Sequence, residues 1–178
     1  TIPSAEERKK IAAFLSVTDE KILALENKTQ MLQDYKRSVA QELFNQKARF
    51  TGDDGSDYPE WEFKRLDQLF EEVNRKVGEA KVETYSITAG KGFVSQAKKF
   101  GKDISGKQNA RYTLLHPNEL SYNKGNSKSY KYGCVYANHL ETPVAGPNLF
   151  ISFKPKDKGS VVNFYEQLFI DHYLDRSL

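Results

Sequence analysis

The segment at residues 121–133 carries the side chains best suited to bind a polyanion. It alternates lysine, serine and asparagine with tyrosine, and it contains two glycines. Lysine and serine donate hydrogen bonds to phosphate oxygens, and asparagine pairs well with adenine in the major groove of DNA. A polar hairpin without a ligand has a similar composition and remains the alternative. The candidate contacts in this segment are Asn123, Lys124, Asn126, Ser127, Lys128, Tyr130 and Lys131.

Positive charge is concentrated in the same part of the chain. The formal net charge is only +3, which decides nothing by itself. Between residues 91 and 131, however, the acidic residues are only Asp103 and Glu119. A local basic stretch attracts polyanions, although a solvated lysine-rich surface has the same composition. We expect further phosphate contacts from Lys91, Lys98 and Lys99, and a further base-edge contact from Gln96.

The sequence contains no recognisable catalytic centre. The Asn-Pro-Pro-Tyr/Phe signature of methyltransferases and a glycine-rich cofactor turn are both absent. The histidines lie on separate segments and there is one cysteine, so no zinc-binding spacing arises. Glu62-Phe63-Lys64 resembles the end of a nuclease motif, with Asp54 or Asp57 as its partner, but so short a pattern is frequent by chance. We expect neither catalysis nor a metal nor a cofactor.

A long helix is the first element expected to position these residues, and it spans residues 4–46. This stretch contains neither glycine nor proline, Pro3 precedes it, and Ser4 with Glu7 forms a capping box. Inside it, seam positions recur with alternating spacings of four and three, as in a coiled coil. We expect a helix–helix interface formed by Ile11, Leu15, Ile22, Leu25, Leu32, Val39 and Leu43.

Polar residues interrupt this seam at Thr18, Thr29 and Lys36, as register-setting residues do. At about 1.5 Å per residue the helix would be on the order of 60 Å long, more than the width of a domain of this size. The alternative is an amphipathic helix that folds back on its own domain. The charged outer faces favour a partner helix instead, and a second apolar edge widens the contact: Phe14, Met31, Tyr35 and Phe44.

The rest of the chain predicts a separate domain of short strands and helices. Turn-forming residues make 51–57 a linker between a helical domain at 1–50 and a second domain at 58–178. In the second domain we expect helices at residues 66–76 and 161–173. The expected strands lie at residues 84–88, 92–94, 110–114, 120–122, 134–136 and 149–153, and residues 141–148 are expected to form a rigid turn.

These elements place the chain in the α+β class, as a long coiled-coil helix followed by a mixed α/β domain with a twisted sheet. A chain of 178 residues has room for one ordinary domain and the helix. The single cysteine excludes a disulfide framework, no stretch approaches the roughly 20 apolar residues of a membrane span, and no signal peptide is recognisable. We expect a cytoplasmic protein without membrane contact. Because it starts at Thr1 without methionine, we expect a piece of a longer protein.

Many positions of the long helix match a known family in order. They are residues 3–16, Asp19, Ile22, Leu32, Lys36 and residues 41–44. This pattern resembles the conserved-region helix in the specificity subunit of type I restriction-modification enzymes, although Arg8 stands where that family usually has glutamine. The resemblance implies a spacer helix that sets the distance between two DNA-reading domains and docks on the methyltransferase subunits.

Residues of the second domain extend this resemblance. They are residues 85–88, 92–96, 120–124 and 127–133, together with Tyr112, Leu115, Pro117 and Val135. They are similar to the target recognition domain of the same family, in which a Gly-Asp pair precedes a Tyr-Asn-Lys turn. Here Asn118-Glu119 stands in place of that pair. A complete domain of the family carries further strands and a second conserved helix, so we expect this one to be incomplete at its C-terminal end.

The resemblance implies a non-catalytic DNA sequence-specificity subunit, or a fragment of one. Such a subunit reads one half of a bipartite site in double-stranded DNA, while methyltransferase and restriction subunits supply the chemistry. A lone apolar seam is expected to self-associate, so we expect a homodimer through the long helix. The alternative is a coiled-coil adaptor whose globular part binds another protein.

Overall fold

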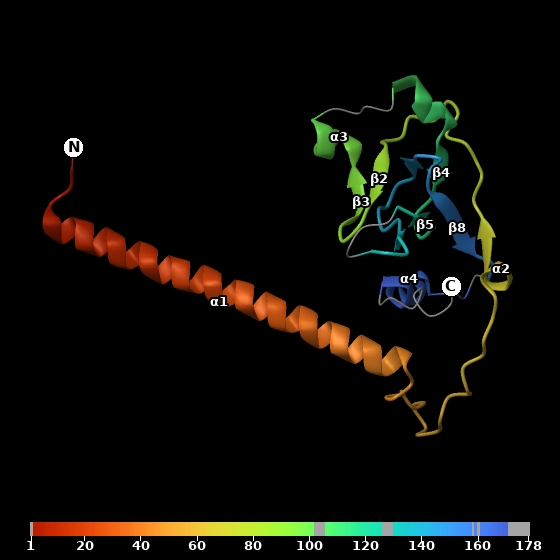
Figure 1. Ribbon diagram of the computed structural model, residues 1–178, viewed down its shortest axis with the longest axis horizontal. Helices are drawn as coiled ribbons and strands as arrows, with labels where there is room; N and C mark the ends of the chain where they lie inside the picture. The colour runs from red at the N-terminus through yellow and green to blue at the C-terminus, as the bar shows by residue number, and fades with distance from the viewer. Residues whose placement is uncertain (1, 102–105, 126–129, 158, 160, 171–178) are drawn as a thin grey trace. The chain divides into compact units, whose positions relative to one another are not determined.

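The computed structural model describes residues 2–101, 106–125, 130–157, 159 and 161–170 (Figure 1). The chain divides into two compact units, Thr1–Ser56 and Asp57–Leu178. In the part of the chain described, no helix combines the length and the apolar character that crossing a membrane requires.

The first unit consists mainly of one helix, α1, which runs from Ala5 to Phe44 (Figure 1). Ser4 is its N-cap, and the Ser4 hydroxyl oxygen accepts a hydrogen bond from the Glu7 N–H at 3.2 Å. The helix ends at Asn45, whose N–H donates to the Gln41 carbonyl oxygen at 3.0 Å. The predicted long helix is therefore confirmed, with the predicted cap.

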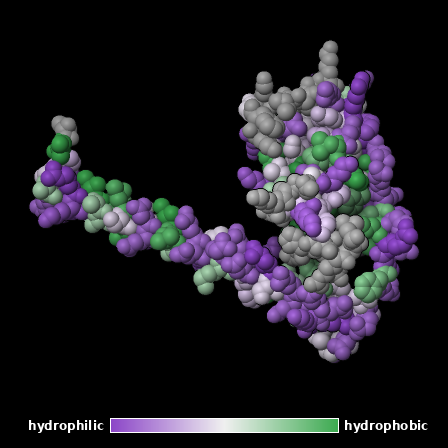
Figure 2. Space-filling view, viewed as in Figure 1, coloured by the Kyte–Doolittle hydropathy of each residue, from purple (hydrophilic) through white to green (hydrophobic). Residues whose placement is uncertain are grey.

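None of the residues of α1 is buried. Apolar residues lie between charged ones along its surface (Figure 2). Two of the polar seam residues bond back to their own helix, since the hydroxyls of Thr18 and Thr29 donate to the carbonyl oxygens of Phe14 and Leu25 at 3.0 and 2.8 Å. These hydroxyls are thus satisfied without a partner helix.

The second unit contains a four-stranded sheet and two short strand pairs. In the sheet the order is β1 (Phe70–Glu72), β8 (Ile151–Pro155), β5 (Leu120–Asn123) and β6 (Cys134–Ala137). The pairs are β2 (Tyr85–Thr88) with β3 (Gly92–Ser95), and β4 (Thr113–Leu115) with β7 (Val144–Gly146). These ladders are antiparallel, and one isolated parallel bridge joins Thr84 to Ala145. The chain is therefore α+β.

Short helices complete this unit. They are α2 (Leu66–Leu69), α3 (Gln96–Phe100), the 3-10 helix η1 (Gly106–Arg111) and α4 (Val162–Ile170). Helix α4 packs on the sheet, and the rings of Phe70 and Tyr165 meet edge to face with centroids 4.8 Å apart. The main core combines residues of the sheet and of α4, namely Phe70, Leu120, Val135, Ala137 and Phe169.

Several local predictions need correction. The helix predicted at residues 66–76 is wrong beyond Leu69, because Phe70–Glu72 pairs with β8 as a strand. The turn predicted at 141–148 contains strand β7, and the strand predicted at 110–114 begins only at Thr113, after η1. The predicted C-terminal helix is present at Val162–Ile170, and its remaining residues lie outside the part described. The other predicted strands are present with ends shifted by one or two residues.

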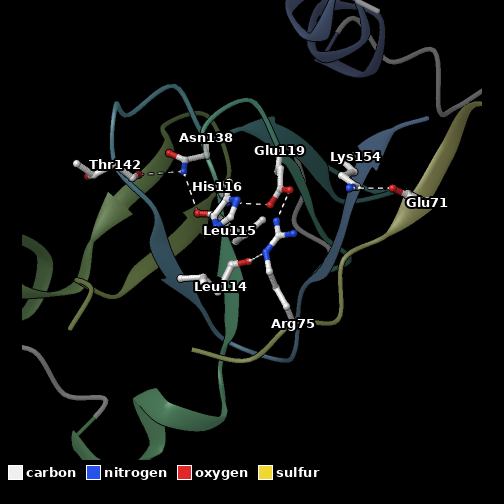
Figure 3. A network of polar contacts seen from close by, with 9 residues as sticks. All are labelled: Glu71, Arg75, Leu114, Leu115, His116, Glu119, Asn138, Thr142 and Lys154. Carbon is white, nitrogen blue, oxygen red and sulfur yellow. Dashed lines mark hydrogen bonds and ion pairs between the residues drawn. The ribbon is translucent and has the colours of Figure 1, made fainter. Parts of the chain in front are cut away.

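A polar network closes the turn between β4 and β5 (Figure 3). The Glu119 carboxylate accepts a hydrogen bond from the His116 N–H at 2.8 Å and forms an ion pair with Arg75. Arg75 also donates from Nε to the Leu114 carbonyl oxygen at 3.0 Å. The Glu119 side chain is nearly buried, so its charge needs these partners. The network therefore fixes the start of β5, the strand that leads into the candidate site.

Candidate nucleic-acid interface

The β2–β3 turn and the β5–β6 loop lie side by side in the second unit. The Asn123 amide nitrogen donates to the Ile87 carbonyl oxygen at 2.9 Å, and the Gly90 N–H donates to the Tyr136 hydroxyl oxygen at 2.9 Å. These contacts join segments that are 36 and 46 residues apart in sequence. Lys91, Lys124 and Lys131 are therefore carried by adjoining segments of the chain.

The β2–β3 turn presents Lys91. Gly90 and Gly92 flank this lysine with φ angles of 73° and 72°, a left-handed conformation that glycine adopts without strain. The turn is closed by a hydrogen bond from the Lys91 N–H to the Thr88 carbonyl oxygen at 3.0 Å. The Lys91 side chain is exposed, so its ammonium group is available to an anion.

The β5–β6 loop presents Lys124 and Lys131, which are both exposed. The Lys131 ammonium nitrogen lies 5.1 Å from the centroid of the Tyr132 ring, a cation–π distance. Gly133 closes the loop with a φ of 85°, and a Cβ at this position would clash with the Asn123 carbonyl oxygen. The loop is therefore held tightly at its base, while Lys124 and Lys131 face solvent.

Two predicted base-reading residues have internal roles. The Gln96 side chain is buried, and its amide nitrogen donates to the Ser86 hydroxyl at 3.2 Å. The Asn123 amide bonds at both ends, because its oxygen also accepts from the Gly125 N–H at 2.9 Å. The Gln96 amide thus joins α3 to β2 and the Asn123 amide joins β5 to β2, so both side chains are engaged within the fold.

The remaining predicted contacts divide into three groups. Tyr130 is half-buried and packs on a small core that includes Ile87, Tyr136 and Phe150, so it supports the loop from below. Lys98 is exposed on α3, one turn after the N-cap Ser95. The side chain of Lys99 and the residues Asn126, Ser127 and Lys128 lie outside the described part of the chain.

The predicted helix–helix contacts form an exposed stripe on α1. The exposed fraction is 65% at Leu25 and 58% at Leu32, while Ile11, Leu15 and Ile22 are exposed to a similar degree. Val39 and Leu43, nearer the end of the helix, are half-exposed. A shallow hollow of about 350 Å³ runs along the same face, lined by Ile22, Leu25, Glu26, Thr29, Gln30 and Gln33. In a coiled coil, a hollow between seam residues receives a side chain of the second helix.

Among the described residues, no three histidine, cysteine, aspartate or glutamate side chains gather in a group that would hold a metal ion. Cys134 is buried, and burial raises the pKa of its thiol, which disfavours the reactive thiolate.

Tyr136 is a residue of this site that the sequence did not indicate. It is 9% exposed in strand β6, and its hydroxyl oxygen accepts the Gly90 N–H. Its importance depends on a contact between distant segments, and no local spacing encodes such a contact. The sequence features that belong to this contact are the two glycines of the turn and a tyrosine 46 residues after Gly90.

We compared the chain with models of known protein families, with curated proteins and with solved structures, and none of the three comparisons found a match.

Proposed function

We propose that this chain is a non-catalytic DNA sequence-specificity subunit, or part of one, of a type I restriction-modification system in the cytoplasm. The observation that carries the proposal is the joined pair of basic loops in the second unit. The exposed apolar stripe on α1 supports it independently. In this proposal the second unit reads one half of a bipartite site, and methyltransferase and restriction subunits supply the chemistry.

The two loops suit the phosphate backbone of double-stranded DNA. Lys91, Lys124 and Lys131 come from adjoining loops, whereas Lys98 lies on α3, beyond the opposite end of β3. Phosphate contacts set the position of a protein on DNA, and base-edge contacts then provide specificity. We assign the phosphate contacts to Lys91, Lys124 and Lys131, and the base-edge contacts to Asn126 and Ser127, which stand between β5 and β6 in the sequence.

Helix α1 suits a spacer that binds other helices on two edges. Beside the main seam lies the second apolar edge, on which Phe14 and Met31 are each 73% exposed. This edge consists of Phe14, Met31, Tyr35 and Phe44. We assign the main seam to a second copy of α1 and the second edge to the methyltransferase subunits.

The order of residues in the main seam favours an antiparallel pair of α1 helices. About a centre at residue 27, the seam is nearly palindromic, so antiparallel copies match apolar with apolar residues. The matched layers would be Ile11 with Leu43, Leu15 with Val39, and Ile22 with Leu32. Thr18 would then face Lys36, and no layer would contain two charges.

A parallel pair has better flanking charges but a worse seam. In register, Lys21 would face Glu26 of the second copy, and each such exposed pair is worth about 0.2–1 kcal/mol. In an antiparallel pair, Glu26 instead lies near Glu26 of the second copy, and Lys28 lies near Lys28. Repulsion between these exposed like charges has a similarly small cost. The parallel seam, however, sets Lys36 against Lys36, and desolvating two like charges costs more than the exposed pairs contribute. The seam therefore favours the antiparallel pair.

Salt-dependent DNA binding tests the proposal. Binding to phosphates weakens with added salt at a log–log slope of roughly −0.9 per phosphate contacted. We expect Lys124→Ala to weaken binding of short duplexes by roughly threefold to tenfold and to reduce the slope by about one contact. Fluorescence anisotropy measures both quantities. A range of about 50 to 300 mM salt covers the conditions in which phosphate contacts weaken.

Lys81→Ala is the matched control for this experiment. Lys81 is exposed and precedes β2, at the end opposite to the turn that carries Lys91, so its loss should change neither affinity nor slope. Salt-independent binding, or equal effects of the two variants, would contradict the proposal. That result would favour the alternative, a coiled-coil adaptor that binds another protein.

A further inference from the structure

The β2–β3 turn rests on the side chain of Tyr136. The hydroxyl oxygen of this residue accepts the Gly90 N–H at 2.9 Å and shares a further hydrogen bond with the Tyr130 side chain. The Tyr136 ring lies beneath Gly92, where a Cβ would stand 3.5 Å from the ring. One tyrosine therefore contacts both glycines of the turn.

This hydroxyl is well suited to a permanent structural contact. Burial is the main cause that raises the pKa of Tyr136, to about 12, so the group keeps its proton at neutral pH. A protonated hydroxyl accepts one hydrogen bond and donates another. Tyr136 is thus able to hold Gly90 and Tyr130 simultaneously, which ties the β2–β3 turn to the β5–β6 loop.

The turn needs such a contact because its own sequence is permissive. Gly90 and Gly92 both have left-handed φ angles, and glycine has the largest conformational freedom of any residue. The turn is closed locally by the bond between the Lys91 N–H and the Thr88 carbonyl oxygen. Without an external acceptor for Gly90, Lys91 would sample many positions, and binding an anion would carry the cost of ordering it.

We propose that Tyr136 is a positioning residue that orders the β2–β3 turn so that Lys91 meets a DNA phosphate. This inference rests on the DNA-binding function proposed above. Tyr136 itself touches no phosphate, because it is 9% exposed and its hydroxyl is engaged by Gly90. It acts through Lys91.

A double-mutant cycle between Tyr136→Phe and Lys91→Ala tests the proposal. Phenylalanine keeps the ring and removes the hydroxyl, so amide hydrogen exchange at Gly90 should become faster. We expect each single variant to weaken DNA binding by roughly threefold to tenfold and to reduce the salt slope by about one contact. In the Lys91→Ala background, Tyr136→Phe should have no further effect on DNA affinity.

Tyr85→Phe is the matched control. Tyr85 stands at the end of β2 away from the turn, and its hydroxyl donates to the Glu83 carboxylate. It should leave DNA binding unchanged. Unchanged affinity of Tyr136→Phe, or an equal loss in both backgrounds, would overturn the positioning role, because general destabilisation does not depend on Lys91. If the unaltered protein shows no salt-dependent DNA binding, the proposed function itself fails, and the exchange at Gly90 remains a separate readout of the contact.

Discussion

Asn118 and Glu119 show how single residues keep the turn before β5 closed. Asn118 has a φ of 63°, a left-handed conformation that glycine and asparagine adopt more readily than other residues. The Glu119 carboxylate accepts the His116 N–H and pairs with Arg75. Asn118 and Glu119 thus supply the two things that this turn requires, a left-handed residue and an acceptor for the His116 N–H.

Gly133 provides a prediction on stability. Its φ is 85°, and a Cβ there would clash with the Asn123 carbonyl oxygen, so both strain and collision oppose a side chain. We expect Gly133→Ala to lower the free energy of unfolding by about 1–3 kcal/mol, measured by urea denaturation. Gly78→Ala is the control, because Gly78 has a φ of 60° and no atom near the Cβ position. An equal loss in both variants would show that the collision contributes nothing.

The sequence predicted residue types of the site better than residue roles. The exposed lysines were foreseeable because charge in a polar loop remains in solvent. The internal roles of Gln96 and Asn123 were not, because their partners Ser86 and Ile87 lie 10 and 36 residues away. An amide has the same chemistry for a base edge and for a backbone carbonyl, and only the fold decides which one it meets.

At the scale of elements, local signals succeeded where the structure is local. Helix α1 follows from its cap and its heptad spacing, which involve only neighbouring residues. The residues after Leu69 have helical apolar spacing, yet Phe70–Glu72 forms a strand because β8 offers a complete set of backbone partners. Strand β7 was hidden between Pro143 and Pro147, which indicate a turn when they are considered alone.

Disulfide trapping tests the antiparallel pairing of α1. In an antiparallel pair, position 11 of one copy lies beside position 43 of the other. A mixture of Ile11→Cys and Leu43→Cys proteins should therefore give mainly the mixed disulfide, because cysteine pairs require Cα atoms within about 7 Å. Non-reducing gels with differently tagged copies measure the products. Predominant links between identical variants would indicate a parallel pair, and the buried Cys134 serves as the internal unreactive thiol.

At the scale of the whole molecule, the proposed function gives the two units separable tasks, which can be tested separately. Light scattering should give a dimer for the chain alone and a larger complex after a methyltransferase subunit is added. Leu32→Asp places a charge in the apolar seam, so we expect it to give a monomer whose DNA salt slope is unchanged. Asn27→Asp, on the outer face of α1, is the control and should remain dimeric. The spacer role would be contradicted if the unaltered protein were a monomer and did not bind the methyltransferase subunit.

Trp61 gives the two units distinguishable optical signals. It is the only tryptophan of the chain, it is 40% exposed, and its ring meets that of Phe164 edge to face with centroids 6.1 Å apart. Intrinsic fluorescence therefore reports the second unit, whereas the circular dichroism of helices is dominated by α1, which contributes 40 residues. Melting curves recorded by the two methods should not coincide, and the chain should not be described by a single midpoint temperature. Dilution should shift only the dichroism curve, because dissociation of helix pairs depends on concentration.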